Sequence, residues 1–435
     1  MNTLFSNITV VTMDNSNTVL TDAFVGVTDG KISWLSKKAP EEKPRQIIDG
    51  TGMVLLPGLV NCHVNPELTV LRGLADDVSE AVRLGERLYP AEEKLDDRSA
   101  EAAALLTFAE CVRYGTTSVS CLSRHPSAVA KAAAACGIKA NVAMEAVLVA
   151  DENFSFDENP DCQSLQAAFE QWHNHDDGRI RIDAGIQGEY TSSHVMWEAL
   201  SEFAVTNGLT MQLRLSQTID EHEGCLDRTG LTPAQLLDCH GLFKVPAQAA
   251  FCTHLELDDM ALLGRRKASC VHCPVSDEKL CHGKADILSM VKNGMNVALG
   301  TDAAPNAGSL DLFRQMRAAA FGAKAASGDP ETLNAQTALL LATVCGARAQ
   351  GRAAECGVIA VGMDADLCML DFTGPHLVPC HNVVNSAVWA ASGSDVCMTM
   401  VRGNIVYAAG KYPCLDLQAL MKELAEHAMP TLLAE

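Results

Sequence analysis

Apolar runs of strand length recur along the middle of the chain, and stretches with helical periodicity separate them. Leu105, Phe108 and Val112, for example, share one face of a predicted helix that stops at Gly115. The apolar runs lie near residues 54–65, 116–122, 138–145, 180–187, 209–217, 248–254, 268–273 and 296–302. Eight buried strands with intervening helices predict an α/β fold, a (β/α)8 TIM barrel.

The two ends of the chain have a different pattern. Residues 1–56 are strand-like, and Asp29-Gly30 is a hairpin turn signal. Strand-like residues return after Arg352, and residues 416–430 have a helical pattern. We therefore predict β structure at both ends of the barrel segment, followed by a C-terminal helix.

Composition narrows the classes of protein and partner. A chain of 435 residues has room for two domains, and 48% hydrophobic with 20% charged residues is ordinary for a soluble, enzyme-like protein. The net charge of −21 argues against nucleic acid or an anionic membrane as a partner, and no apolar run reaches membrane-spanning length. The 17 cysteines are spread along predicted strands and helices, and no secretory signal is visible, so we expect a cytoplasmic protein.

The strongest chemical signal lies at the end of the first barrel strand. His63 and Asn65 are two residues apart, so their side chains point the same way from a strand. Two histidines at this spacing would form a forked metal ligand. Here the second arm is an asparagine, which has no imidazole nitrogen.

Short sequence motifs that are typical of one protein family occur along nearly the whole chain. They are PGLVNCH (57–63), LRGLADD (71–77), GTTS (115–118), CTHLELDDMALL (252–263), VHCPVSDEKL (271–280), ALGTDAAPNAGSLDLFRQMR (298–317), GAR (346–348) and VGMDADL (361–367). With these motifs the chain resembles the amidohydrolase superfamily, in the branch of the methylthioadenosine/S-adenosylhomocysteine and guanine deaminases and the triazine hydrolases (chlorohydrolases). The resemblance implies a barrel at residues 57–352, a small β-sandwich from residues 1–56 and 353–415, and a terminal helix at residues 416–435.

The resemblance also implies a mononuclear zinc or iron site at the carboxyl ends of the barrel strands, with protein acid/base groups beside it. Two of its six metal and proton-transfer positions keep the family residue, as His63 and Asp302. Four are changed: Asn65 and Arg214 replace ligand histidines, Gln217 replaces a glutamate, and Phe251 replaces a histidine. Arginine is permanently cationic, and neither glutamine nor phenylalanine transfers a proton near neutral pH.

These replacements lead to a hypothesis about the site. We expect no tightly bound metal cofactor at His63, and we expect the Arg214 guanidinium to pair with Asp302 in the metal's place. Residues expected to contact a small-molecule ligand are Arg72, Gln187, Arg214 and His272, where Arg214 would suit an anionic group. Simpler alternatives stay open: His63 as a hydrogen-bonded strand-end histidine, and His272 as a core residue.

Two functions remain on this evidence. The first is a pseudoenzyme, catalytically inactive or re-purposed to bind a small molecule or a homologous subunit, including a homo-oligomer. The alternative is an active hydrolase of non-peptide carbon–nitrogen bonds, such as a purine or nucleoside-type deaminase, with an unconventional metal site. Fold alone does not decide between them.

Overall fold

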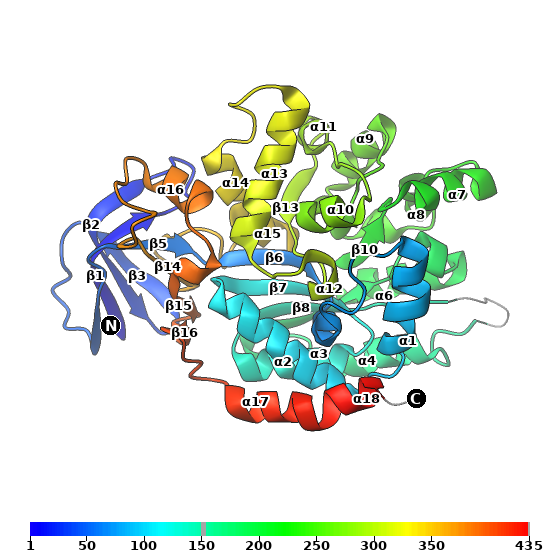
Figure 1. Ribbon diagram of the computed structural model, residues 1–435, viewed down its shortest axis with the longest axis horizontal. Helices are drawn as coiled ribbons and strands as arrows, with labels where there is room; N and C mark the ends of the chain where they lie inside the picture. The colour runs from blue at the N-terminus through cyan, green and yellow to red at the C-terminus, as the bar shows by residue number, and fades with distance from the viewer. Residues whose placement is uncertain (149–153, 434–435) are drawn as a thin grey trace.

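The computed structural model describes residues 1–148 and 154–433, and a barrel of eight parallel strands lies at its centre (Figure 1). Neighbouring strands follow the chain order. The strands are β6 (Leu59–Val64), β7 (Thr116–Ser123), β8 (Lys139–Met144), β9 (Ile180–Gly185), β10 (Met211–Leu215), β11 (Ala247–Phe251), β12 (Ser269–His272) and β13 (Asn296–Leu299). The prediction of an α/β barrel is confirmed.

The last strand closes the barrel against the first. β13 contacts β6, and the backbone N–H of Asp302 donates to the carbonyl of His63 at 3.0 Å. Gly300 makes this approach possible, because a Cβ there would lie 2.9 Å from the Cβ of His63. The closure therefore places the ends of strands β6 and β13 together at one rim.

The first predicted strand differs from the structure. The run at 54–65 forms two strands, β5 (Met53–Pro57) and β6, which belong to different sheets. Gly58 separates them: its N–H donates to the carbonyl of Asp366, whereas Leu59 N–H donates to Gly115 in the barrel. A continuous apolar run does not reveal such a change of sheet, since both strands are buried.

Helices surround the barrel, and local signals set their ends. The Asp96 carboxylate caps α2 (Asp97–Arg113) by accepting from the N–H of Ser99 at 2.7 Å. Gly137, with φ +85°, ends α3. Other long barrel helices are α3 (Pro126–Cys136), α4 (Pro160–Trp172), α6 (His194–Asn207), α7 (Ile219–Thr229), α9 (Leu257–Arg266) and α13 (Leu312–Ser327).

Strands from both ends of the chain form the separate sheet at the left of Figure 1. Its hydrogen-bonded order is β16-β15-β14-β5-β1-β2-β3, with β4 beside β1. Side chains from β1, β2, β3, β14 and β15 share one apolar core, so this mixed sheet curls around its own interior. The strands are β1 (Thr3–Val11), β2 (Val19–Thr28), β3 (Lys31–Ser36), β4 (Gln46–Asp49), β14 (Leu367–Asp371), β15 (Val396–Val401) and β16 (Asn404–Ala408).

Helical structure also lies within and after the C-terminal strands. α16 (Val383–Trp389) packs its buried Val384 and Val388 into the barrel's core. The chain then runs along α2 as α17 (Leu417–Glu423), η6 (Leu424–Ala428) and α18 (Met429–Leu433), where Leu420 and Leu424 cover Ala102 (Figure 1). The predicted C-terminal helix is thus present in the described residues.

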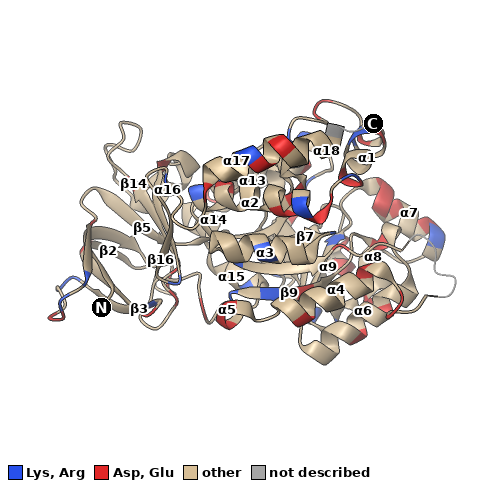
Figure 2. Ribbon diagram, turned by 90° about the horizontal axis from the view of Figure 1, so that it is seen from below, with Lys and Arg blue, Asp and Glu red and all other residues tan. Residues whose placement is uncertain are grey.

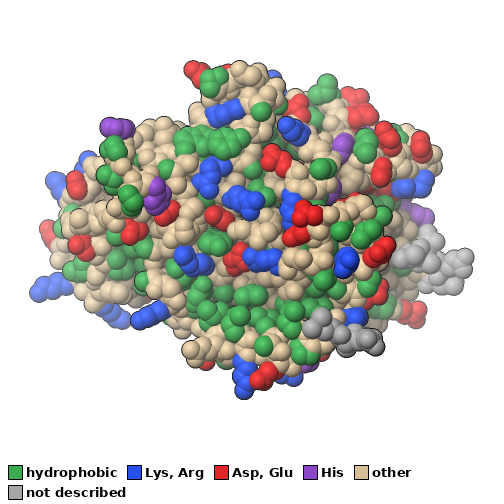
Figure 3. Space-filling model, in the orientation of Figure 1, with side chains coloured by type: hydrophobic (Ala, Val, Ile, Leu, Met, Phe, Trp, Pro, Cys, Tyr) green, Lys and Arg blue, Asp and Glu red, His purple; other side chains and the backbone are tan. Residues whose placement is uncertain are grey.

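The surface carries mixed charge. Figure 2 marks acidic residues on α7 and α17 with basic residues scattered between them, and Figure 3 shows hydrophobic side chains gathered above α17. All 17 cysteines are free. Among the described helices, none is long and apolar enough to cross a bilayer.

Candidate functional site at the mouth of the barrel

A cavity of about 300 Å³ lies at the carboxyl ends of the barrel strands. The chain between β6 and α2 covers it, as η1 (Pro66–Leu71), η2 (Val82–Leu88) and α1 (Tyr89–Glu92). Strand ends supply its polar floor, and the covering segment supplies three leucines, Leu68, Leu84 and Leu88. This position is where barrel proteins place their functional groups.

His63 and Asp302 face each other beneath this cavity. His63 Nε2 lies 3.9 Å from Asp302 Oδ1, and the two side chains are 4% and 1% exposed. Burial, opposed by the charge of Asp302 and aided by that of Arg214, lowers the pKa of His63 to about 4. His63 is therefore neutral at pH 7, and its buried Nε2 has no hydrogen-bond partner in the described part of the chain.

Arg214 pairs with Glu145, which directly follows β8. Its Nη2 lies 2.7 Å from Glu145 Oε1, and Asn65 Nδ2 donates to Glu145 Oε2 at 3.1 Å. Asn65 Nδ2 also donates to the carbonyl of Leu122 at 2.8 Å. The amide nitrogen of Asn65 is thus committed to protein acceptors.

The predicted pairing of Arg214 with Asp302 is wrong, for two physical reasons. Asp302 is already satisfied: it accepts from Ser276 Oγ at 2.5 Å, from Ala303 N–H at 2.6 Å and from Asn306 Nδ2 at 2.9 Å. Glu145, a buried carboxylate that the sequence interpretation did not consider, lies closer to the guanidinium. It directly follows the apolar residues Val142-Ala143-Met144 at the end of β8, and this strand-end position is the signal that would have found it.

Phe251 and Gln217 lie beside a histidine from another part of the chain. Gln217 Nε2 is 3.3 Å from His282 Nδ1, and the rings of Phe251 and His282 meet edge to face at 6.2 Å. Asp277 and Glu80 face His282 and raise its pKa to about 9 against the opposing effect of burial. The sequence interpretation missed this imidazolium because His282 follows α10 (Pro274–Leu280), away from the strand-end motifs.

The four residues predicted to contact a ligand do not all lie at the same cavity. Gln187 and Arg214 line the mouth cavity. Arg72 instead pairs with Glu110 and donates to the carbonyl of Gly308 at 3.0 Å. His272 lines a different cavity of about 450 Å³ beside α10 and α13, and burial lowers its pKa to about 4.

Three glutamates meet at the edge of the mouth cavity. One oxygen each from Glu67, Glu92 and Glu145 lies within 4.8 Å of the others. Burial and the charges of Glu145 and Glu67 raise the pKa of Glu92 to about 8. Glu67 and Glu92 come from the covering segment, whose packing against the strand ends no sequence motif specified.

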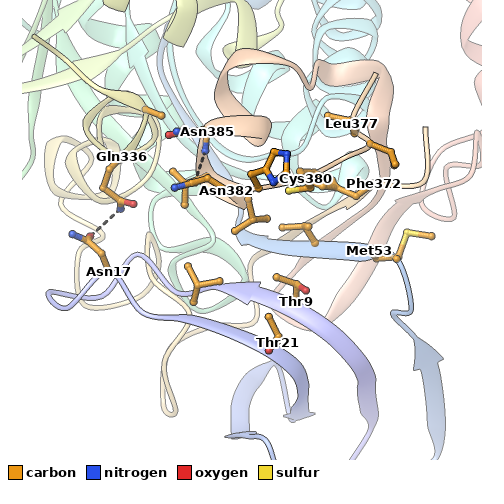
Figure 4. Close-up of a pocket in the computed structure, with 18 of the residues that line it drawn as sticks. Thr9, Asn17, Thr21, Met53, Gln336, Phe372, Leu377, Cys380, Asn382 and Asn385 are labelled. Carbon is orange, nitrogen blue, oxygen red and sulfur yellow. Dashed lines mark hydrogen bonds between the residues drawn. The ribbon is translucent and has the colours of Figure 1, made fainter. Parts of the chain in front are cut away.

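A larger cavity, about 820 Å³, lies between the separate sheet and the helices α14 (Ala335–Leu341) and α16 (Figure 4). Its polar lining is held by neutral hydrogen bonds: Gln336 Nε2 donates to Asn17 Oδ1 at 2.9 Å, and the Asn385 N–H donates to Asn382 Oδ1 at 3.0 Å. No Asp, Glu, Lys or Arg is among the described residues that line it. The mouth cavity, where charged groups converge, is the better candidate site.

Comparisons with known proteins agree with the architecture. Residues 54–406 match the profile described as "Amidohydrolase family". The 5-methylthioadenosine/S-adenosylhomocysteine deaminase of Acetivibrio thermocellus is 33% identical over 99% of this chain and 100% of its own. The 5'-deoxyadenosine deaminase of Methanosarcina mazei is 33% identical over 98% and 97%. The crystal structure of an adenosine deaminase from Xanthomonas campestris with bound zinc has a TM-score of 0.93 at 27% identity, over 99% and 98% of the two chains.

Proposed function

Because the chain belongs to the amidohydrolase family, we propose that it binds an adenosine-type small molecule in the mouth cavity without a mononuclear metal centre at His63. The single observation that carries the proposal is the Arg214–Glu145 ion pair, at the strand end from which a ligand histidine would reach the metal.

Part of the metal's surroundings would fit an ion. His63 Nε2 is neutral, buried and unpartnered, and Asp302 Oδ1 is 3.9 Å from it, a spacing that two ligands of one ion can adopt. The remaining groups do not fit. Asn65 turns its amide nitrogen to Leu122 and Glu145, Phe251 offers no ligand atom, and Arg214 adds a fixed positive charge. At about 4 Å and an effective dielectric of about 20, that charge would repel a dication by roughly 8 kcal/mol.

The expected ligand class follows from the relatives. Deaminases named for methylthioadenosine, S-adenosylhomocysteine and 5'-deoxyadenosine are similar to this chain over nearly its whole length. A cavity of about 300 Å³, lined mainly by polar and charged side chains with three leucines and Phe251, suits a ligand of nucleoside size. Gln187 and Gln217 line it and offer the paired donor and acceptor that recognition of a purine edge requires.

Two measurements on the purified protein test the proposal. Elemental analysis should find well below one transition metal per chain, and calorimetry should detect 5'-deoxyadenosine or methylthioadenosine binding without conversion to the inosine-type product. Stoichiometric zinc or iron, or turnover that a chelator abolishes, would overturn it.

A variant sharpens the metal test. Asn65→His, Arg214→His, Gln217→Glu and Phe251→His together should restore zinc uptake, but removing Arg214 orphans the Glu145 carboxylate. Glu145→Gln should therefore accompany them. The variant with all five substitutions should bind zinc, whereas Arg214→His alone should not.

The second candidate is an active deaminase, favoured by the full-length similarity to named deaminases and by the free Nε2 of His63. It predicts hydrolytic release of ammonia from an adenosine-type substrate, with loss of activity in His63→Gln and Asp302→Asn. Activity in the untreated protein distinguishes the two candidates directly.

A further inference from the structure

The charges that line the mouth cavity do not balance. Its three arginines are each bound to a carboxylate: Arg83 to Glu80 at 2.6 Å, Arg214 to Glu145 at 2.7 Å, and Arg228 to Glu189 at 2.7 Å. Glu92 lines the same cavity and forms no ion pair with any residue that the structure describes. The lining arginines therefore already have carboxylate partners, whereas four lining carboxylates have no arginine or lysine partner in the described part of the chain: Glu92, Asp220, Glu221 and Asp302.

Groups behind Glu92 increase this excess. Glu67 and Glu145 approach it to within 4.8 Å, and the charges of two arginines, Arg214 and Arg124, oppose the carboxylates at Glu92 and Glu145. Asn65 is fully buried beside Glu145, and its Oδ1 has no donor in the described part of the chain. This end of the cavity thus has acceptors and negative charge in excess of donors and positive charge.

Aromatic rings flank the same end. Tyr89 precedes Glu92 by one turn on the short helix α1, and Tyr190 lines the cavity from the loop after β9. Aromatic faces attract cations, most strongly where water is displaced. An anionic group would meet Glu92 and find each lining arginine already paired.

We propose that the mouth cavity selects ligands that carry a positive charge, a protonated amine held between Glu92 and the rings of Tyr89 and Tyr190. The amine would donate hydrogen bonds to Glu92, and its charge would stabilise the ionised carboxylate. Without a ligand Glu92 is largely protonated at pH 7.5, because its pKa lies near 8. This inference replaces the anionic ligand expected from Arg214, and it rests on the proposed adenosine-type function for the rest of the ligand.

Three matched ligands test the choice of charge. 5'-Amino-5'-deoxyadenosine, 5'-deoxyadenosine and adenosine 5'-phosphate share the purine and sugar but carry a positive, neutral and negative 5' group. Calorimetry at pH 7.5 should rank their affinities in that order, with roughly tenfold between the amine and the neutral ligand, as expected for about 1.4 kcal/mol. Equal affinity for these two, or tighter binding of the phosphate, would overturn the inference. Failure of all three to bind would instead overturn the proposed function.

Substitutions at two neighbouring glutamates test whether the preference for the amine depends on Glu92. Glu92→Gln removes the charge but keeps the shape of the side chain, and it should reduce the preference for the amine to less than about threefold. Glu93→Gln is the matched control, because Glu93 is the next residue along the chain and is exposed outside the cavity lining. A preference that survives Glu92→Gln, or that disappears equally in Glu93→Gln, would contradict the role of Glu92.

Discussion

Buried charged groups are paired at the amino end of the barrel strands, whereas some of those at the carboxyl end have no partner. At the amino end of β8, Lys139 is fully buried and lies 2.6 Å from Asp366 and 2.7 Å from Asp364. Arg352, also fully buried, donates to Asn141, Glu355 and three backbone carbonyls. These bonds tie the barrel to the segment that leads into the separate sheet. All the acceptors of these Arg352 hydrogen bonds belong to the protein, so the bonds stabilise the fold.

At the carboxyl end of the same strands, some charged and polar groups lack an ion-pair or hydrogen-bond partner among the described residues. Three glutamates face the charges of two arginines, Arg214 and Arg124, and His63 Nε2 and Asn65 Oδ1 have no hydrogen-bond partner among the described residues. Phe251 and Asp302 adopt φ values of +74° and +61°, which are costly for residues other than glycine. Unpartnered polar groups and backbone strain are thus both present where a ligand is expected to bind, a combination found at functional sites.

The largest loss of stability should come from a substitution at the amino end of the barrel strands, where the buried charges are paired. Lys139→Met keeps the apolar stem but leaves Asp364 and Asp366 without their shared cation. We expect a loss of about 3–5 kcal/mol in the free energy of unfolding, as for a buried ion pair that loses one partner. Urea denaturation measures it. Lys131→Met, which breaks the exposed pair with Glu101, is the control and should cost less than about 1 kcal/mol. Similar losses in both variants would contradict the comparison.

At the mouth, breaking the Arg214–Glu145 pair should cost less. Arg214→Met leaves Glu145 unpaired, but burial already raises the pKa of Glu145 and favours its neutral form. We expect a loss of about 2–3 kcal/mol, of which Arg214→Met with Glu145→Gln should recover at least half. A double variant no more stable than the single one would show that Arg214 acts through other contacts.

The contrast also explains which parts of the molecule the sequence predicted. The eight strands followed from apolar runs, because burial on both faces leaves that pattern in any sequence. His63 followed from its position at a strand end and Asp302 from the family resemblance, and the two side chains do face each other. Glu92 was missed because its place depends on how residues 66–92 fold over the mouth, which is tertiary packing with no local signal. The Arg214 pairing failed for the same reason: the choice between Glu145 and Asp302 depends on distances between strands that are far apart in sequence.

An effect of similar size should appear on acidification. Burial holds the folded-state pKa of His63 near 4, below the value of about 6.5 in the unfolded chain. The unfolded chain therefore takes up a proton first, and stability is lost as pH falls from about 6.5 to 4, by up to roughly 3 kcal/mol. His63→Gln should reduce the slope of stability against pH in this window by the contribution of one histidine. His272, whose pKa burial also lowers to about 4, should keep a similar contribution. His376→Gln, on an exposed side chain, should keep the wild-type slope.

The smallest expected effect has the opposite sign and isolates Glu92. Its folded-state pKa of about 8 lies above the usual value of 4.5, so the folded protein holds this proton more tightly than the unfolded chain. The resulting stability is present at low pH and is lost as pH rises from about 4.5 to 8. Glu92→Gln should therefore match wild type near pH 4 and exceed its stability by about 1 kcal/mol at pH 9, a value reduced for partial exposure to solvent. Thermal unfolding at the two pH values measures the difference, and Glu93→Gln should show none. If Glu92→Gln were instead less stable at pH 9, a cation would already balance the glutamates, and the mouth would resemble the amino end of the barrel strands.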